Sequence, residues 1–195
     1  MRLDDIVRAW IRPGARVLDL GCGDGRLLHD LGRTRGVQGY GLEIDQHNIQ
    51  LCIAAGVNVI EQDLDRGLGN FATDSFDTVV MTQTLQAVRF PHLVLDEMLR
   101  VGREGVITFP NFGNWRCRLH LSVRGRMPVS RFLPYSWYDT PNIHFCTVFD
   151  FEALCRQKNI HVLNRIVVDA DNRVTAATRL APNLCGMTAI YHVSK

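Results

Sequence analysis

The sequence predicts an α/β protein with a mostly parallel, doubly wound sheet, and three observations support this fold class. Five short apolar runs of strand type alternate with helical segments of about ten residues, an order typical of parallel sheets. A glycine-rich turn follows the first of these runs, at the end of a strand where such folds bind ligands. Two further strand-like runs, at 160–168 and 188–193, complete the chain.

Length and composition indicate one globular domain over residues 1–195. Apolar residues make up 46% of the chain and charged residues 22%, which is ordinary for a globular protein. The net charge of +2 means that nucleic acid or membrane binding would need a local patch, so neither is expected. No apolar run is long enough to span a membrane. Acidic residues stand where a signal peptide would be apolar, so we expect a cytoplasmic protein.

The first half of the chain alternates helix and strand. Apolar residues at helical spacing predict a helix over 3–10, and Pro13-Gly14 ends it before a strand at 17–20. A helix with a buried leucine stripe then runs to Gly36, and Asp24 can cap its start. A second strand spans 40–43, and Asp45 is a plausible cap for the next helix, which Gly56 closes. Further strands are expected at 57–60, 76–81 and 106–109.

The glycine spacing after the first strand separates two kinds of nucleotide site. The turn reads Gly21-Cys22-Gly23-Asp24-Gly25, so position 26 is Arg26 where a dinucleotide fingerprint needs glycine. Alternate glycines let the backbone turn and approach a ligand closely. Glu43 ends the next strand, where a carboxylate can accept both hydroxyl hydrogens of a ribose. The pattern therefore favours a ligand that carries a ribose and is not a dinucleotide.

The second half departs from strict alternation. Pro91 suits the first position of a helix that Gly102 stops. Residues 111–147 form an insert rich in aromatic residues, and three prolines limit regular structure there. All charges between Glu104 and Asp139 are arginines, at positions 116, 118, 124, 126 and 131. A helix capped by Asp150 should follow, and 171–187 should form a hairpin-like connection between the last two strands.

The G-x-G-x-G turn, with Asp19 two residues before it, resembles the first motif of class I S-adenosylmethionine (SAM)-dependent methyltransferases. Three stretches of the insert narrow the resemblance: Asn111-Phe112-Gly113-Asn114-Trp115, Gly125-Arg126-Met127-Pro128, and the run from Leu133 to His144. Together with 17–25 and 83–87 they resemble the MetW family of methionine biosynthesis proteins, over essentially the whole chain.

This resemblance implies the Rossmann-like class I methyltransferase fold, with a seven-stranded sheet whose last strand is antiparallel and an insert after the fifth strand. It implies a bacterial protein that binds SAM or S-adenosylhomocysteine and works with the homoserine O-acyltransferase MetX, without implying methyl transfer of its own. The residues expected to contact the cofactor are Asp19, Gly21, Cys22, Gly23, Gly25, Glu43, Ile44, Asp63, Leu64 and Gln83.

Candidate chemistry beyond cofactor binding is sparse. His144 is a candidate general base, weighed against a hydrogen-bonded structural histidine; His120 and His92 are less well placed. The Asn-Pro-Pro-Tyr signature of amino-group methyltransferases is absent, and the six scattered cysteines lack the spacing of a metal site. The insert arginines have three interpretations: a solvated lid face, a surface for an acidic partner, or a site for a small anion.

Two hypotheses follow for the function. In the first, the protein activates or regulates MetX, and the 111–147 insert is the docking surface. SAM is a downstream product of methionine, so a SAM site on such a partner would provide feedback control. In the second, the protein is a methyltransferase on a small-molecule or peptide acceptor, and the insert is a lid over the cofactor mouth.

Overall fold

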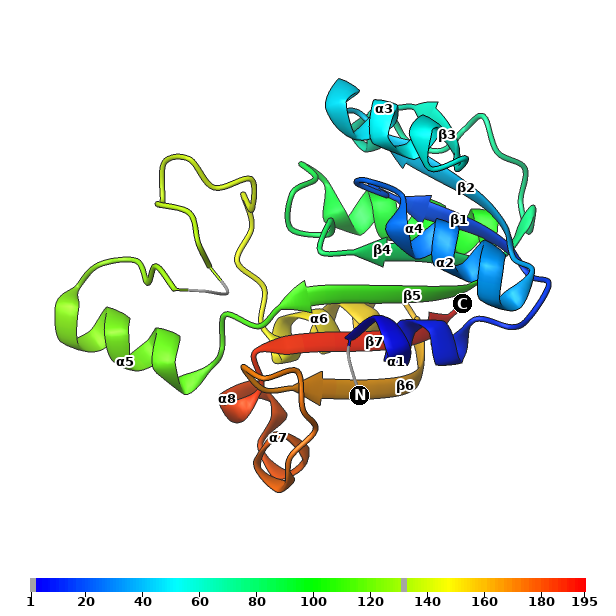
Figure 1. Ribbon diagram of the computed structural model, residues 1–195. Helices are drawn as coiled ribbons and strands as arrows, with labels where there is room; N and C mark the ends of the chain where they lie inside the picture. The colour runs from blue at the N-terminus through cyan, green and yellow to red at the C-terminus, as the bar shows by residue number, and fades with distance from the viewer. Residues whose placement is uncertain (1–2, 131–132) are drawn as a thin grey trace.

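The computed structural model describes residues 3–130 and 133–195, and its centre is a seven-stranded sheet (Figure 1). The strands lie in the order β3-β2-β1-β4-β5-β7-β6. Neighbours from β3 to β5 are parallel, whereas β7 is antiparallel to both β5 and β6. The strands are β1 (Arg16–Leu20), β2 (Gln38–Glu43), β3 (Asn58–Glu61), β4 (Phe76–Thr82), β5 (Gly102–Pro110), β6 (His161–Val168) and β7 (Thr188–Ser194).

Helices cover both faces of this sheet, so the core has two layers. On one face, Ile6 and Leu31 pack with Val17 and Val106; on the other, Leu95 and buried residues of the later helices pack against neighbouring strand positions. Successive side chains of a strand point to opposite faces of the sheet, so each strand contributes residues to both layers of the core. The covering helices are α1 (Leu3–Trp10), α2 (Arg26–Arg35), α3 (Gln46–Ala54), α4 (Pro91–Val101) and α6 (Val148–Gln157).

The expected α/β class, strand sequence and antiparallel ending are confirmed. Two expected helix caps are wrong. Gly25 precedes α2 in a left-handed conformation, and Asp24 instead accepts the N–H of Arg26 at 3.3 Å. Thr147 caps α6 in a capping box in which Asp150 is the third helical residue rather than the cap. Asp45 does cap α3, through the N–H of Asn48 at 2.9 Å.

Short helices occupy regions where little regular structure was expected. The insert contains α5 (Trp115–Arg124), capped by Asn114 and ended by Gly125. The connection between β6 and β7 carries α7 (Ala176–Leu180) and α8 (Pro182–Cys185), and η1 (Leu64–Arg66) is a 3₁₀ turn after β3. Arg131 and Phe132 of the insert lie outside the described residues. Within the described ranges, no helix is long and apolar enough to cross a membrane.

Candidate functional site

The candidate site lies at the carboxyl ends of the four parallel strands β3, β2, β1 and β4. The strand order reverses between β1 and β4, which is where open α/β sheets bind ligands. The glycine turn leaves β1, Glu43 ends β2, Asp63 follows β3, and Gln83 follows β4. The topology thus brings together the residues that the sequence analysis expected to share one ligand.

The glycines of the turn serve different purposes. Gly21 has a φ of 77°, and a Cβ there would come within 2.6 Å of the Thr84 hydroxyl, so glycine is needed for the β4–α4 loop to pack on the turn. Gly23 has a φ of 55°, and a Cβ there would meet no protein atom within 4 Å. The open space beside Gly23 is therefore space that a ligand can use.

Glu43, at the end of β2, is hydrogen-bonded to the glycine turn. Its Oε2 atom accepts the N–H of Gly23 at 2.8 Å, while Oε1 accepts the N–H groups of Ile44 and Asp45 at 2.8 and 3.0 Å. A carboxylate has about four acceptor positions, and three are used here, so Glu43 can still accept one hydroxyl hydrogen from a ribose. The exposed Ile44 side chain next to it offers an apolar surface to a flat base.

Asp19 is the electrostatic centre of the site. Its side chain is 1% exposed, and Oδ1 has no hydrogen-bond partner in the described structure. Burial, and then the negative charge of Glu43, raise the pKa of Asp19 to about 7. A buried carboxyl group without a partner either holds a proton or pairs with a cation brought by a ligand. This suits a ligand that carries a positive charge.

Asp63 and Leu64 form the far side of the site. The Asp63 Oδ1 atom accepts the N–H of Asp65 at 2.9 Å and so caps η1, while Oδ2 lies 3.9 Å from the Arg66 guanidinium. Leu64 packs its side chain into the core, which leaves only its backbone to contact a ligand. The two residues therefore lie at the end of β3, as the sequence analysis expected, and a ligand contact remains a prediction.

Gln83 follows β4 in a left-handed conformation. Its φ of 58° is unusual for a residue with a side chain. The backbone N–H donates to the Thr108 carbonyl at 3.0 Å, which ties the loop to β5. Such strain at the carboxyl end of a central strand is typical of functional sites.

Cys22 turns its side chain away from the site. The thiol lies 3.8 Å from the Cys52 sulfur, and a Cβ on Gly41 would come within 2.3 Å of it. Burial raises the pKa of the Cys22 thiol, so it is a poor nucleophile. Only the backbone of Cys22 is available to a ligand. Gly41 and Thr84 shape the turn. The segment from Thr82 to Gln86 was expected to face the ligand, but the sequence did not show that Thr84 packs on Gly21, because nothing in the local pattern shows which distant residues contact the turn.

His144 connects the insert to the loop after β4. Its backbone N–H donates to the Gln86 carbonyl at 3.1 Å, and the ring Nε2 lies 3.2 Å from the Arg89 carbonyl. A carbonyl can only accept, so this contact assigns the proton to Nε2. These contacts are those of a structural histidine, and the role of general base remains a prediction.

Asn111 fixes the base of the insert. This buried residue donates through Nδ2 to the carbonyls of Asn183 and Gly186, both at 2.9 Å. Its Oδ1 accepts the N–H groups of Gly113 and Val148 at 3.0 and 3.2 Å. Part of the Asn-Phe-Gly-Asn-Trp stretch therefore serves architecture, since it joins the insert to α6 and α8.

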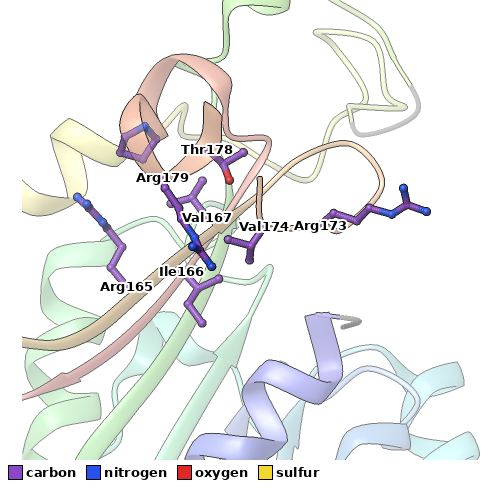
Figure 2. A pocket seen from close by; sticks show the side chains of 8 residues that line it. Arg165, Ile166, Val167, Arg173, Val174, Thr178 and Arg179 are labelled. Atoms are coloured by element: carbon purple, nitrogen blue, oxygen red, sulfur yellow. The ribbon is translucent and has the colours of Figure 1, made fainter. Parts of the chain in front are cut away.

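A separate hollow lies along the edge strand β6. It measures about 680 Å³, and Arg165, Arg173 and Arg179 border it (Figure 2). Three strands separate β6 from β1, so this hollow is not part of the site. Arg165 is paired with Glu152 at 2.6 Å. The hollow offers none of the carboxylates or glycines that an adenosine ligand requires.

Comparison with known sequences finds one matching family model and two related proteins. A family model described as "Methionine biosynthesis protein MetW" matches residues 2–193. The chain is 38% identical over 189 residues to the "Bifunctional methionine biosynthesis protein MetXA/MetW" of Rhodopirellula baltica, a match that covers 92% of this chain and 30% of the relative. It is 31% identical over 114 residues to the "Ubiquinone biosynthesis O-methyltransferase" of Hahella chejuensis, covering 56% of this chain and 48% of that protein. The chain thus spans less than half the length of either relative.

Comparison with solved structures establishes the fold. A SAM-dependent methyltransferase from Methanosarcina mazei superposes with a TM-score of 0.72 at 16% identity, over 100% of this chain and 99% of that one. One from Mesorhizobium loti gives 0.71 at 19% identity, over 98% and 96%. The expected class I methyltransferase fold is confirmed.

Proposed function

The chain belongs to the MetW family of methionine biosynthesis proteins, and from this premise we propose that it binds SAM or S-adenosylhomocysteine and acts with the homoserine O-acyltransferase MetX in the cytoplasm. In this role it activates or regulates the acylation of homoserine. The bifunctional relative supports the partnership, because its name assigns MetXA and MetW to one polypeptide. A covalent link between two proteins raises their effective concentration toward each other and so favours their association.

The single observation that carries cofactor binding is the charge and shape of the cradle around Gly23. The space beside this glycine is open, and Asp19 Oδ1, which has no hydrogen-bond partner among the described residues, can pair with the positive charge of SAM. Glu43 would accept a ribose hydroxyl hydrogen at its remaining acceptor position, and Asp63 with the backbone of Leu64 would hold the adenine. When bound, SAM supplies a methyl group activated by its sulfonium; the residues of the cradle bind and orient it.

A second candidate function is methyl transfer to a small-molecule or peptide acceptor. It is favoured by the match to an O-methyltransferase and by the His144 ring, whose Nδ1 is the basic nitrogen when Nε2 donates to the Arg89 carbonyl and could take a proton from a hydroxyl or thiol acceptor. Formation of S-adenosylhomocysteine from labelled SAM in a cell extract, lost in a Gly23→Arg variant, would support this function.

Co-expression with the acyltransferase of the same genome tests the first function. We expect the two proteins to elute together, and acyl transfer by the complex to change when SAM is added. Calorimetry on the isolated chain should detect SAM binding that Gly23→Arg abolishes. Separate elution, together with equal acyl transfer with and without SAM, would contradict the partnership.

A further inference from the structure

Helix α5 extends from the body of the protein and is held at its first turn. In Figure 1 it lies beyond the carboxyl end of β5, away from the helices that cover the sheet. Asn114 accepts the N–H of Arg116, Arg118 donates to the Gly113 carbonyl, and Cys117 is buried. The other described elements have at most marginal contact with α5. Its last two turns therefore present their side chains to solvent.

These exposed side chains form two parallel rows. Trp115, Leu119 and Val123 follow one another at a spacing of four residues, which places them on one face of the helix. They are 46%, 53% and 73% exposed. Single exposed apolar residues are normal, but a continuous row marks an interaction site. We call this set the apolar row.

The second row is basic and lies beside the first. Arg116, His120 and Arg124 share the same spacing, one residue further along the chain, which rotates them by about 100° around the helix. The sequence has no acidic residue between Glu104 and Asp139, so the insert cannot neutralise this row from within that segment. The helix thus presents an apolar row with positive charge along one side.

We propose that the apolar row of α5 inserts into an apolar groove on the acyltransferase partner, and that carboxylates along one rim of the groove face Arg116 and Arg124. This inference rests on the proposed function and specifies its interface. An amphipathic helix in a groove is a common mode of protein recognition. A second copy of this chain fits less well, because two α5 helices packed together would bring their basic rows close to each other.

Charge reversal and apolar-to-acid substitutions test the interface in the co-expressed complex. Leu119→Asp and Val123→Asp should each weaken binding of the purified acyltransferase at least tenfold, measured by biolayer interferometry. Ile53→Asp is the matched control, because Ile53 is 65% exposed on the surface of α3, and it should leave the affinity unchanged. The double variant Arg116→Glu, Arg124→Glu should also weaken binding, and wild-type affinity should fall with added salt.

The possible failures are distinguishable. If the wild-type chain does not bind the acyltransferase, the proposed partnership fails and this interface fails with it. If the wild-type chain binds but Leu119→Asp and Val123→Asp bind as tightly as Ile53→Asp, only the interface is overturned. Loss of self-association in these variants, seen by sedimentation, without loss of acyltransferase binding would assign the apolar row to a second copy instead. Circular dichroism on each variant verifies folding independently of any ligand.

Discussion

At the scale of single residues, the buried carboxyl group of Asp19 makes stability depend on pH. Its pKa of about 7 in the folded state lies above the ordinary value of 3.8, so the folded protein keeps a proton that the unfolded chain releases. The free energy of unfolding should therefore fall as the pH rises from about 4 to about 7. From pH 5 to pH 8 this loss is on the order of 2–3 kcal/mol.

The Asp19→Asn variant isolates this contribution, because asparagine does not ionise. Urea unfolding of both proteins at pH 5 and pH 8 should show a smaller loss of stability for the variant. SAM binding to the wild-type protein should tighten as the pH rises through about 7, since the ionised carboxylate attracts the cation. Equal pH dependence of the unfolding free energy in the two proteins would show that burial does not raise the pKa of Asp19.

The two glycines at the start of the turn should respond differently to a methyl group. In Gly23→Ala the new Cβ meets no protein atom, so the cost in stability is the strain of a positive φ, about 1 kcal/mol. In Gly21→Ala it would collide with Thr84, and the cost should be larger. Gly23→Ala should nonetheless weaken SAM binding, because the methyl group enters the ligand space. Thermal melts and calorimetry on both variants test this contrast; unchanged SAM affinity in Gly23→Ala would place the ligand elsewhere.

The sequence alone predicted that the glycine turn and Glu43 follow successive strands. The turn comes directly after the first strand, and Glu43 ends the second strand, with one helix between them. The sequence could not show that Glu43 would bind the N–H of Gly23, nor that Gly41 would make room for Cys22. Both features depend on how β1 and β2 pair, and pairing joins residues far apart in the chain. The left-handed Gln83 also had no local signal, because glutamine shows no preference for that conformation.

At the scale of elements, Asn111 joins β5, α6 and α8. We expect Asn111→Ala to cost about 3 kcal/mol, because the buried Asn183 carbonyl and two buried N–H groups lose their bonds to Asn111, while the Gly186 carbonyl keeps only its bond from Asn114 Nδ2 at 3.0 Å. Urea unfolding gives this value. Asn142→Ala, at a half-buried position of the same insert, is the control and should change stability less. A loss below 1 kcal/mol for Asn111→Ala would mean that water replaces the four bonds.

The strands were predictable because each is a run of strand type bounded by turn residues, whereas of the three expected aspartate caps only Asp45 was correct. Asp150 lies only three residues after Thr147, and both take part in one capping box, so their order could be read either way. Helix α5 had usable signals in Asn114 and Gly125, but the prolines elsewhere in the insert suggested irregular structure. Helices α7 and α8 have five and four residues, too few to show a helical period.

At the scale of the whole molecule, the β4–α4 loop lies between the candidate cofactor site and the insert. Thr84 packs on Gly21 at one end of this loop, and the Gln86 carbonyl accepts the N–H of His144 beyond it. The Gln86 side chain also donates to the Pro110 carbonyl, where the insert leaves β5. Contacts between ligand and loop can therefore reach both ends of the insert that carries α5.

Hydrogen exchange on the isolated chain tests this coupling. A ligand in the cradle should stabilise the β4–α4 loop, so the amide of His144 should exchange more slowly when SAM is added. A tenfold slowing corresponds to about 1.4 kcal/mol. His144→Ala keeps the backbone N–H but loses the ring contact to Arg89, and it should reduce the effect without weakening SAM binding. Amides of the edge strand β6 serve as the internal control. Slower exchange at Gly21 and Gly23 alone would confine the ligand's influence to the cradle, and feedback control through the insert would then need another route.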